Sequence, residues 1–277
     1  VPEVDAVLGT TSYGDILKAI REAMEGKHFQ EFKDIDYLPE KLGKRVLTTG
    51  GHFGYLKIAE GCDKHCTYCI IPKLRGKFRS VPMERLVTQA KEMAEEGVKE
   101  LILVAQETTV YGTDIYGKKS LHILLKELCK IKGIRWIRVL YCYPEEIYDE
   151  LIQTMKEEKK ICHYLDLPIQ HASDRILKRM GRRTTQAELV EIVNKLRREI
   201  PDIVLRTTLI SGFPGETQED HEELMGFVDE MEFDRLGVFT YSPEEDTPAA
   251  TMPDQVAEEV KEARRDEIME LQQEISY

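Results

Sequence analysis

The sequence contains no run of 18 consecutive apolar residues, and it does not open with the basic, apolar and small-residue pattern of a secretory signal. Without such a run no helix is expected to span a bilayer. Without a signal, the six cysteines are expected to be thiols or metal ligands and not disulfides. These absences predict a cytoplasmic protein, and 277 residues suffice for one large or two small domains.

An excess of positive charge is also missing, because 39 Lys and Arg residues face 51 Asp and Glu residues, a net charge of −12. Proteins that bind nucleic acids usually present a basic face, which the chain as a whole does not predict. One basic cluster includes Arg75, Lys77 and Arg79. It is either ordinary solvated surface or, because it follows a cysteine-rich loop directly, a candidate substrate-binding segment.

The cysteine-rich loop carries Cys62, Cys66 and Cys69 at C-x3-C-x2-C spacing, directly after the apolar residues 55–59. Three thiolates can hold three irons of a 4Fe–4S cube and leave the fourth iron open for a ligand. A zinc knuckle or three incidental thiols are the alternatives, but zinc usually needs a second pair of ligands. The remaining cysteines form no such pair, and we interpret Cys142 and Cys162 as small buried apolar residues.

The rest of the sequence alternates apolar strand-like runs with amphipathic helical segments. The expected strands are residues 55–59, 100–105, 136–141, 163–167, 204–210 and 236–241. The expected helices are residues 83–96, 121–131, 146–156, 185–200, 218–230 and 256–275. Six β/α units predict a parallel sheet, and they are fewer than the eight of a closed barrel. A doubly wound sheet and an open partial barrel both fit this pattern.

The amino-terminal segment does not follow this repeated strand and helix pattern. Residues 1–27 predict one short strand and one helix that ends at Gly26, and we expect them to be the tail of a preceding domain. Residues 28–50 are expected to be a linker with a lead-in strand, in which residues 45–49 and 53–59 could form a hairpin. Residues 51–277 would then form the core. Because residue 1 is Val and the last helix has no cap, we expect further domains on both sides.

Functional-looking residues follow the expected strands, and sites of parallel α/β folds lie at the carboxyl ends of strands. Residues 211–217 contain two glycines that let the backbone approach a ligand, and Thr217 can cap the next helix. A plain tight turn with a cap is the alternative. Asp166 and Gln170 could bind a ribose, and Arg175 could pair with a carboxylate or be an exposed helix residue. His171 is expected to be an ordinary hydrogen-bonding residue.

With Tyr68 directly before the last cysteine, the cysteine loop resembles the signature of the radical S-adenosylmethionine (SAM) superfamily. The resemblance implies an open (β/α)6 partial barrel, the α/β fold of that family. It implies that the open iron chelates the amino and carboxylate groups of SAM, and that one electron cleaves SAM to a 5′-deoxyadenosyl radical. It assigns no catalytic side chain. The implied cofactor-binding residues are Tyr68, Gln106, Gln170, Arg175, Arg206, Thr208, Gly212, Glu216 and Tyr241.

Residues 69–80, the sequence G-F-P-G-E-T of residues 212–217 and Y-S-P-x-x-x-T-P-A-A of residues 241–250 resemble the methylthiotransferase branch. Asp246 stands where that branch usually has Gly. The resemblance implies an enzyme that converts a C–H bond into C–SCH3. It also implies a second 4Fe–4S cluster on an amino-terminal domain and a carboxy-terminal TRAM domain, and neither domain is part of this sequence.

Within that branch, residues 104–108, residues 168–173 and Gly181-Arg182 resemble the members that modify the β-carbon of an aspartate in ribosomal protein S-twelve. The alternatives are a tRNA adenosine methylthiotransferase, another radical enzyme on the same barrel, and a non-catalytic iron–sulfur or zinc module. A net charge of −12 disfavours tRNA, a polyanion, and suits a basic ribosomal protein. An electron donor is an expected partner, and a monomer is expected.

Overall fold

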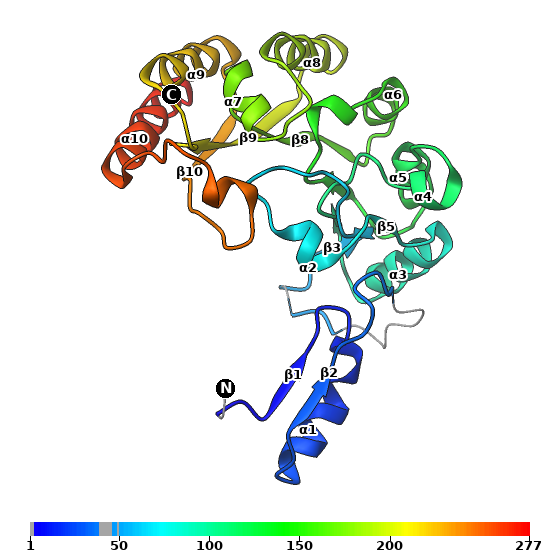
Figure 1. Cartoon of the computed structure of the whole chain (residues 1–277). Coiled ribbons are helices and arrows are strands. Elements are labelled where there is room, and N and C mark those ends of the chain that lie inside the picture. Colours follow the sequence, from blue (N-terminus) through cyan, green and yellow to red (C-terminus); the bar gives the residue numbers. More distant parts are fainter. Residues whose placement is uncertain (1–2, 39–45, 49) are drawn as a thin grey trace.

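The computed structural model describes residues 3–38, 46–48 and 50–277 (Figure 1). The strands are β1 (Ala6–Leu8), β2 (Phe29–Glu31), β3 (Phe53–Lys57), β4 (Ala59–Glu60), β5 (Arg79–Ser80), β6 (Glu100–Val104), β7 (Trp136–Val139), β8 (Ile161–Gln170), β9 (Val204–Ser211) and β10 (Arg235–Thr240). The helices are α1 (Ile16–Met24), α2 (Ile71–Arg75), α3 (Met83–Glu95), α4 (Thr113–Tyr116), α5 (Leu121–Cys129), α6 (Asp149–Glu157), α7 (Asp174–Arg179), α8 (Gln186–Glu199), α9 (Gln218–Met231) and α10 (Glu258–Ile275).

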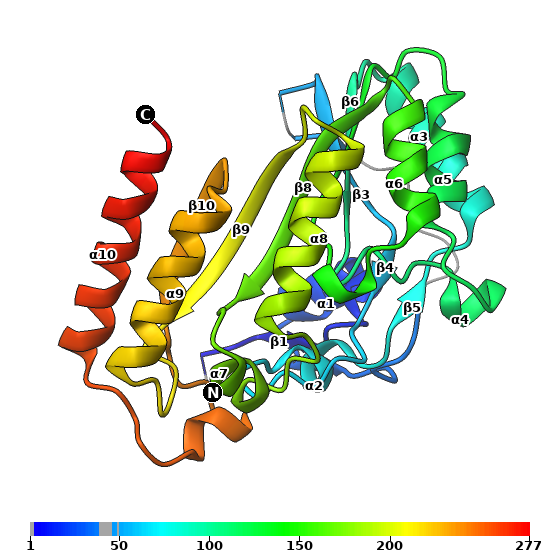
Figure 2. The same cartoon turned by 90° about the horizontal axis from the view of Figure 1, so that it is seen from above.

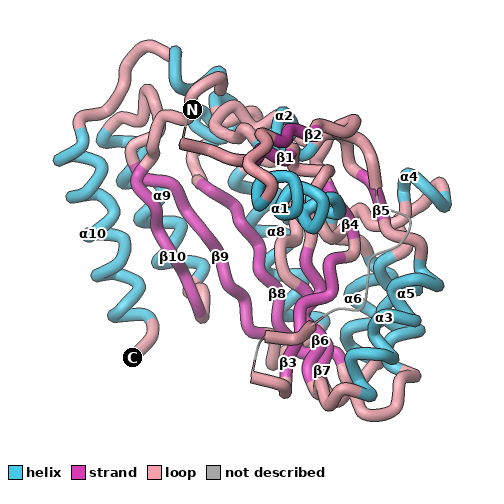
Figure 3. The backbone as a smooth tube through the Cα atoms, turned by 90° about the horizontal axis from the view of Figure 1, so that it is seen from below, coloured by secondary structure: helices cyan, strands magenta, loops and turns pink. Residues whose placement is uncertain are grey.

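Six strands form one sheet in the order β10-β9-β8-β7-β6-β3, and every neighbouring pair is parallel. The main helices lie on the outer side of the curved sheet (Figures 1 and 2). Within the described residues, β3 and β10 do not pair with each other, so the sheet remains open with β10 at one edge (Figure 3). The predicted open (β/α)6 partial barrel is confirmed.

Strand β9 shows how the sequence pattern builds the two faces of the sheet. Leu205, Thr207 and Leu209 are buried, whereas the alternating Arg206 and Thr208 are only half-buried. Successive side chains of a strand point to opposite faces, so the buried set faces the helices and the other set faces the concave side. The concave side therefore keeps polar side chains accessible to a ligand.

The helix that we predicted over residues 146–156 begins later, at Asp149. Pro144–Glu146 form a short 3₁₀ turn, and Tyr148 has an extended backbone with φ −140° and ψ 160°. A residue in that conformation ends any preceding helical turn and serves as the N-cap of the next helix. The correction moves Glu146 out of the helix and places it, with Glu145, in the short 3₁₀ turn that follows β7.

The amino-terminal segment forms a small unit in which β1 pairs in parallel with β2, with α1 between them. Part of the predicted linker, Phe29–Glu31, is therefore a strand, because it supplies the pairing partner that β1 needs. This unit contacts the core, since Thr10 Oγ1 donates to Leu74 O at 2.8 Å. In Figure 1 it projects from the same side of the core as α2.

The predicted hairpin before the core is not seen. Residues 45 and 49 lie outside the described residues, and residues 46–48 carry no strand. Strand β3 pairs in parallel with β6, and β4 departs from the barrel to pair antiparallel with β5. This arrangement buries Leu56 and Ile58 completely in the core. In the described part of the chain, no helix is both long enough and apolar enough to cross a membrane.

Candidate functional site

The cysteine loop leaves the barrel at the carboxyl end of β4 and returns through α2 to β5. The short β4–β5 pairing, with Ala59 opposite Ser80, closes its base. Gly61 has φ +77°, and a Cβ there would lie 2.1 Å from Lys77 O. Only glycine tolerates both this conformation and this close approach, so the loop requires Gly61 directly before its first cysteine.

The middle of the loop is held by two other loops that come from distant strands. Thr67 N donates to Met180 O at 2.9 Å, and Thr67 Oγ1 donates to Arg179 O at 2.8 Å. Ala249 N donates to Thr67 O at 2.9 Å. The segments that follow β8 and β10 therefore fix the cysteine loop from both sides.

The three thiols are set at different depths, because Cys62 and Cys66 are buried and Cys69 is half-buried. Burial raises the pKa of the Cys62 thiol to about 11 and also raises the pKa of Cys69. Across the described residues, no three His, Cys, Asp or Glu side chains converge closely enough to share one metal ion. The charges of Cys66 and Cys69 both act on the Cys62 thiol, so the three thiols face a common space. Three thiols so arranged fit a 4Fe–4S cube, in which each thiolate binds its own iron.

Two side chains that sequence reasoning did not select lie beside the thiols. The hydroxyl of Tyr143 is 3.7 Å from Cys66 Sγ, and the guanidinium of Arg182 stacks 4.2 Å from the centroid of the Tyr143 ring. Lys64 Nζ lies 5.2 Å from that centroid and forms ion pairs with Glu145 and Glu146. Arg182 belongs to a segment noted in the sequence and Tyr143 directly follows Cys142, but their proximity to Cys66 depends on the fold.

Glu107 is a buried acid next to this cluster. Its Oε1 accepts from Thr109 N at 2.8 Å, whereas its Oε2 has no partner among the described residues. Burial is the largest cause that raises the pKa of Glu107 to about 7, although the bonds from Thr109 and the charge of Lys64 act in the opposite direction. The predicted cofactor residue Gln106, its neighbour, instead donates weakly to Glu60 Oε1 at 3.4 Å.

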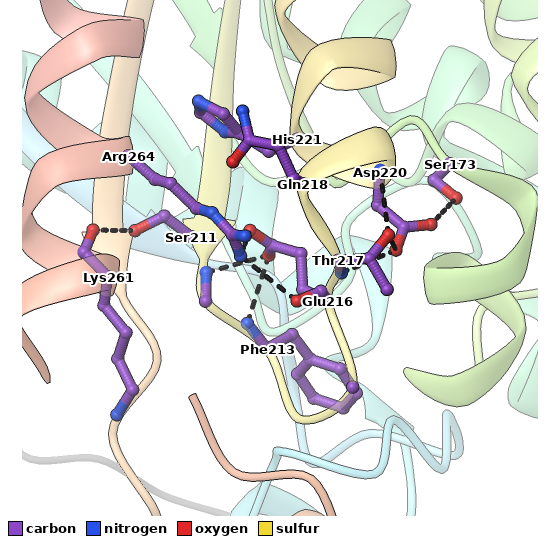
Figure 4. Close-up of polar contacts among 12 residues, drawn as sticks. Ser173, Ser211, Phe213, Glu216, Thr217, Gln218, Asp220, His221, Lys261 and Arg264 are labelled. Atoms are coloured by element: carbon purple, nitrogen blue, oxygen red, sulfur yellow. Dashed lines mark hydrogen bonds and ion pairs between the residues drawn. The ribbon is translucent and has the colours of Figure 1, made fainter. Parts of the chain in front are cut away.

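The glycine-containing loop between β9 and α9 is organised by Glu216 (Figure 4). Its Oε2 accepts from Gly212 N at 2.8 Å and from Phe213 N at 3.1 Å, and its Oε1 accepts from Arg264 Nη1 at 2.9 Å. Burial alone would raise the pKa of Glu216, but His171, Arg264 and Phe213 N–H outweigh it and lower that pKa. The structure therefore gives Glu216 a supporting role inside the loop instead of the predicted contact with a cofactor.

Helix α10 closes this loop from the other side. Ser211 Oγ donates to Lys261 O at 3.0 Å, and a Cβ on Gly212, which has φ +69°, would lie 2.2 Å from Lys261 Cγ. The ring of Phe213 lies edge-on to those of Tyr241 and Tyr68, with centroids 5.3 Å and 6.4 Å away. An aromatic cluster thus links three predicted cofactor residues, Tyr68, Gly212 and Tyr241, across three loops.

The other predicted cofactor residues separate into two groups. Arg206 Nη1 donates to Asp166 Oδ1 at 2.8 Å on the concave side of the sheet, next to Thr208 on the same strand face. Gln170, the last residue of β8, has φ +74°. Arg175, in contrast, forms a bidentate pair with Asp220 and also donates to Gly215 O at 2.7 Å. The carboxylate that we predicted for Arg175 is therefore supplied by the chain itself.

The basic segment also differs from the expectation. Arg79 turns inward and donates to Asp36 Oδ1 at 3.1 Å and to the carbonyls of Lys77 and Arg75. Its guanidinium therefore stabilises the segment that follows the cysteine loop, and these bonds leave it poorly placed to contact a substrate. Lys77 is exposed, and Arg75 is half-buried and lies 3.9 Å from Glu60, so these two side chains stay candidates for the predicted contact with a substrate.

The remaining expectations concern Cys142, Cys162 and His171, which lie outside the cysteine loop. Cys142 is fully buried, as predicted, but Cys162 is only half-buried because it lies near the start of β8, beside Arg138. His171 is a hydrogen-bonding residue as expected, since its Nδ1 accepts from Ser173 N at 3.0 Å.

The fold and the site together define an open-barrel α/β protein with a three-thiol loop at the carboxyl end of its first strand. The model of the Radical SAM superfamily matches residues 56–228, and the chain belongs to this family. Members of the family use a 4Fe–4S cluster and SAM. The match confirms the class expected from the cysteine spacing.

Several proteins are similar to this chain over its whole length. It is 67% identical over 277 residues to "Ribosomal protein uS12 methylthiotransferase RimO" of Lachnoclostridium phytofermentans, covering 100% of this chain and 63% of that protein. The protein of the same name from Clostridium perfringens is 56% identical over 278 residues, covering 100% of this chain and 62% of that protein. The chain thus spans less than two thirds of the length of these relatives.

Solved structures show the same fold. Coproporphyrinogen III oxidase from Escherichia coli superimposes with a TM-score of 0.61 at 19% identity, over 82% of this chain and 53% of that one. The radical SAM methyltransferase TsrM from Kitasatospora setae has a TM-score of 0.60 at 16% identity, over 72% of this chain and 38% of that one.

Proposed function

We propose that this chain is the core of a radical SAM methylthiotransferase that converts a C–H bond of its substrate into C–SCH3. The observation that carries the proposal is the three-thiol loop, clamped at the carboxyl end of a parallel barrel, in a chain 67% identical to a uS12 methylthiotransferase. Cys62, Cys66 and Cys69 would hold the 4Fe–4S cluster. When bound, the cluster and SAM supply the one-electron cleavage that produces a carbon-centred radical.

The concave side of the barrel and the β9–α9 loop would hold SAM. In this proposal Gly212 brings the backbone close to the cofactor, and Tyr68 and Tyr241 flank it through the aromatic cluster with Phe213. Thr208 and Arg206 lie on the open face of β9, and Gln106 and Gln170 complete the set. Glu216 and Arg175 act indirectly, by holding the loop in place.

We propose that residues 51–277 form the radical core and that the β1-α1-β2 unit is the end of a preceding domain. That domain would carry the second 4Fe–4S cluster, and a TRAM domain would follow α10. The proposal is supported by the length of the relatives, of which this chain covers 63% and 62%.

We further propose that the substrate is ribosomal protein S-twelve, modified on the β-carbon of an aspartate, in the cytoplasm, by a monomeric enzyme with a separate electron donor. The net charge of −12 favours a basic protein over tRNA. Arg75 and Lys77 remain candidates for substrate contact. Mass spectrometry of both molecules from a strain that lacks the full-length enzyme tests the assignment. Loss of a methylthio group from tRNA alone would favour the tRNA-modifying alternative.

Cysteine substitutions test the cluster ligands directly. Cys66→Ala should abolish the visible absorbance and most of the iron after anaerobic reconstitution, because the cube then keeps only two thiolates. Cys129→Ala, which alters a half-buried thiol at the end of α5, is the matched control and should keep both. A Cys66→Ala protein with the iron content of the wild type would contradict the ligand assignment.

A further inference from the structure

The pair of Tyr143 and Arg182 is an unusual polar feature of the core. The side chain of Arg182 is 1% exposed, and its Nε and Nη1 have no hydrogen-bond partner among the described residues. Among its three nitrogens only Nη2 donates hydrogen bonds to described residues, to Pro168 O at 3.3 Å and to Glu145 Oε2 at 3.5 Å. A buried guanidinium with unused donors is costly unless an anion lies nearby.

Glu145 is the carboxylate that contacts Arg182, and this contact is too long to balance the charge of the guanidinium. Glu145 contacts Arg182 at the limit of hydrogen-bond distance and also lies 3.8 Å from Lys64. Lys64 and Arg182 both lie near the ring of Tyr143, at 5.2 Å and 4.2 Å from its centroid. Lys64 is paired with Glu146, so Arg182 is the less balanced of the two cations beside a tyrosine whose hydroxyl is 3.7 Å from Cys66 Sγ.

We infer that Arg182 and Tyr143 stabilise the negative charge of the cluster held by Cys66 and so raise its reduction potential. This inference rests on the proposed function, in which Cys66 is a cluster ligand. As a cluster ligand Cys66 is a thiolate without a proton, so the Tyr143 hydroxyl would donate to its sulfur. The charge of Arg182, which lies against the Tyr143 ring, acts on the cluster from the same side. Hydrogen bonds to cluster sulfurs and net local charge are known determinants of cluster potential.

The physical reason is the charge that reduction adds. One electron passes from an external reductant such as dithionite to the cluster, the negative charge of the cluster grows by one unit, and no bond or proton is exchanged. A nearby cation in a poorly solvated environment favours the more negative state. The pair would therefore make the cluster easier to reduce.

The experiment is a redox titration of the reconstituted protein, without SAM, followed by electron paramagnetic resonance and by iron content. Arg182→Gln should lower the midpoint potential, Arg182→Lys should retain most of it, and Tyr143→Phe should lower it by a smaller amount. Arg183→Gln is the matched control, because it removes the same charge one residue away on an exposed side chain and should leave the potential unchanged.

Several outcomes would overturn the inference. An unchanged midpoint potential in Arg182→Gln at full iron content would do so. If the SAM affinity of that variant falls while its potential stays unchanged, Arg182 acts on the carboxylate of SAM and not on the cluster, and the inference is again wrong. If Arg182→Gln cannot be folded, an unchanged potential in Tyr143→Phe decides against it. A wild-type protein that takes up no iron would instead refute the proposed function.

Discussion

Individual buried side chains of this protein have roles that their residue type alone does not reveal. Glu216 was expected to bind a cofactor, yet its carboxylate is saturated by Gly212 N, Phe213 N and Arg264. Glu107 is the opposite case, since one of its carboxylate oxygens has no partner among the described residues. Buried acids are therefore distinguished here by the donors around them, which raise or lower the pKa.

Glu107 leads to a prediction about stability and pH. Burial raises its pKa from 4.5 to about 7 in the folded protein, so the folded chain binds this proton more tightly than the unfolded chain. The resulting contribution to stability is complete below about pH 4.5 and is lost as the pH rises toward 7. Relative to Glu107→Gln, the free energy of unfolding of the wild type should fall by about 3 kcal/mol over this range.

Denaturant unfolding of both proteins between pH 4.5 and pH 8 measures this difference. Gln keeps the oxygen that accepts from Thr109 N, so the substitution changes the titration and little else. Glu92→Gln, on the exposed face of α3, is the control and should track the wild type at every pH. Parallel curves for Glu107→Gln and the wild type would show that Glu107 is ionised in the folded chain.

At the scale of elements, helices α8 and α9 both begin with a capping box, but the segments that precede the two helices differ. Thr185 and Thr217 are N-caps of capping boxes with Glu188 and Asp220. The Thr217 box ends the loop of residues 212–216, which we propose to contact SAM, whereas Thr185 begins a helix that is remote from that loop in sequence. The same local chemistry thus serves the fold in one case and the site in the other.

Alanine substitutions separate these two roles. Thr185→Ala and Thr217→Ala should each lower the free energy of unfolding by about 1 kcal/mol, the usual cost of losing an N-cap. Only Thr217→Ala should also weaken SAM binding, by several-fold, because the loop before α9 loses the two hydrogen bonds of the Thr217 hydroxyl with Asp220. Calorimetry with the reconstituted proteins measures both quantities. Equal SAM affinities for the two variants would argue against a cofactor role for residues 212–216.

At the scale of the whole chain, the open parallel barrel, in which residues 56–228 match the Radical SAM superfamily, is joined to the small β1-α1-β2 unit. It carries one grouped set of three cysteines, while Cys129, Cys142 and Cys162 belong to no cluster of metal-binding side chains among the described residues. We therefore expect the chain to be sufficient for SAM cleavage and insufficient for sulfur insertion.

Anaerobic assays of the 277-residue chain with dithionite test this division. 5′-Deoxyadenosine should form, and methylthiolated product should not, when the two are followed separately. Cys66→Ala should yield neither. Methylthiolated product from this chain would mean that sulfur insertion does not need a second set of cysteines on another domain.

Residue patterns alone left a doubly wound sheet and an open partial barrel both possible, and the family resemblance favoured the barrel. The patterns themselves predicted a parallel sheet, its six main strands to within about three residues, and the three-thiol loop. These features depend on short-range patterns: alternation every second residue, helical spacing of apolar residues, and cysteines a few positions apart. The sequence missed β2 and placed the start of α6 too early, because pairing with β1 and the backbone of Tyr148 decide those boundaries.

Only the tertiary structure decided which side chains surround the thiols. Tyr143 lies 77 positions from Cys66 in the sequence, and Arg182 meets that tyrosine from the loop after α7. The same applies to Arg264, which reaches Glu216 across 48 positions. Such contacts depend on strand order and on the paths of the loops at one end of the barrel. Local periodicity contains no information about either, so the supporting residues of the site became visible only in the folded chain.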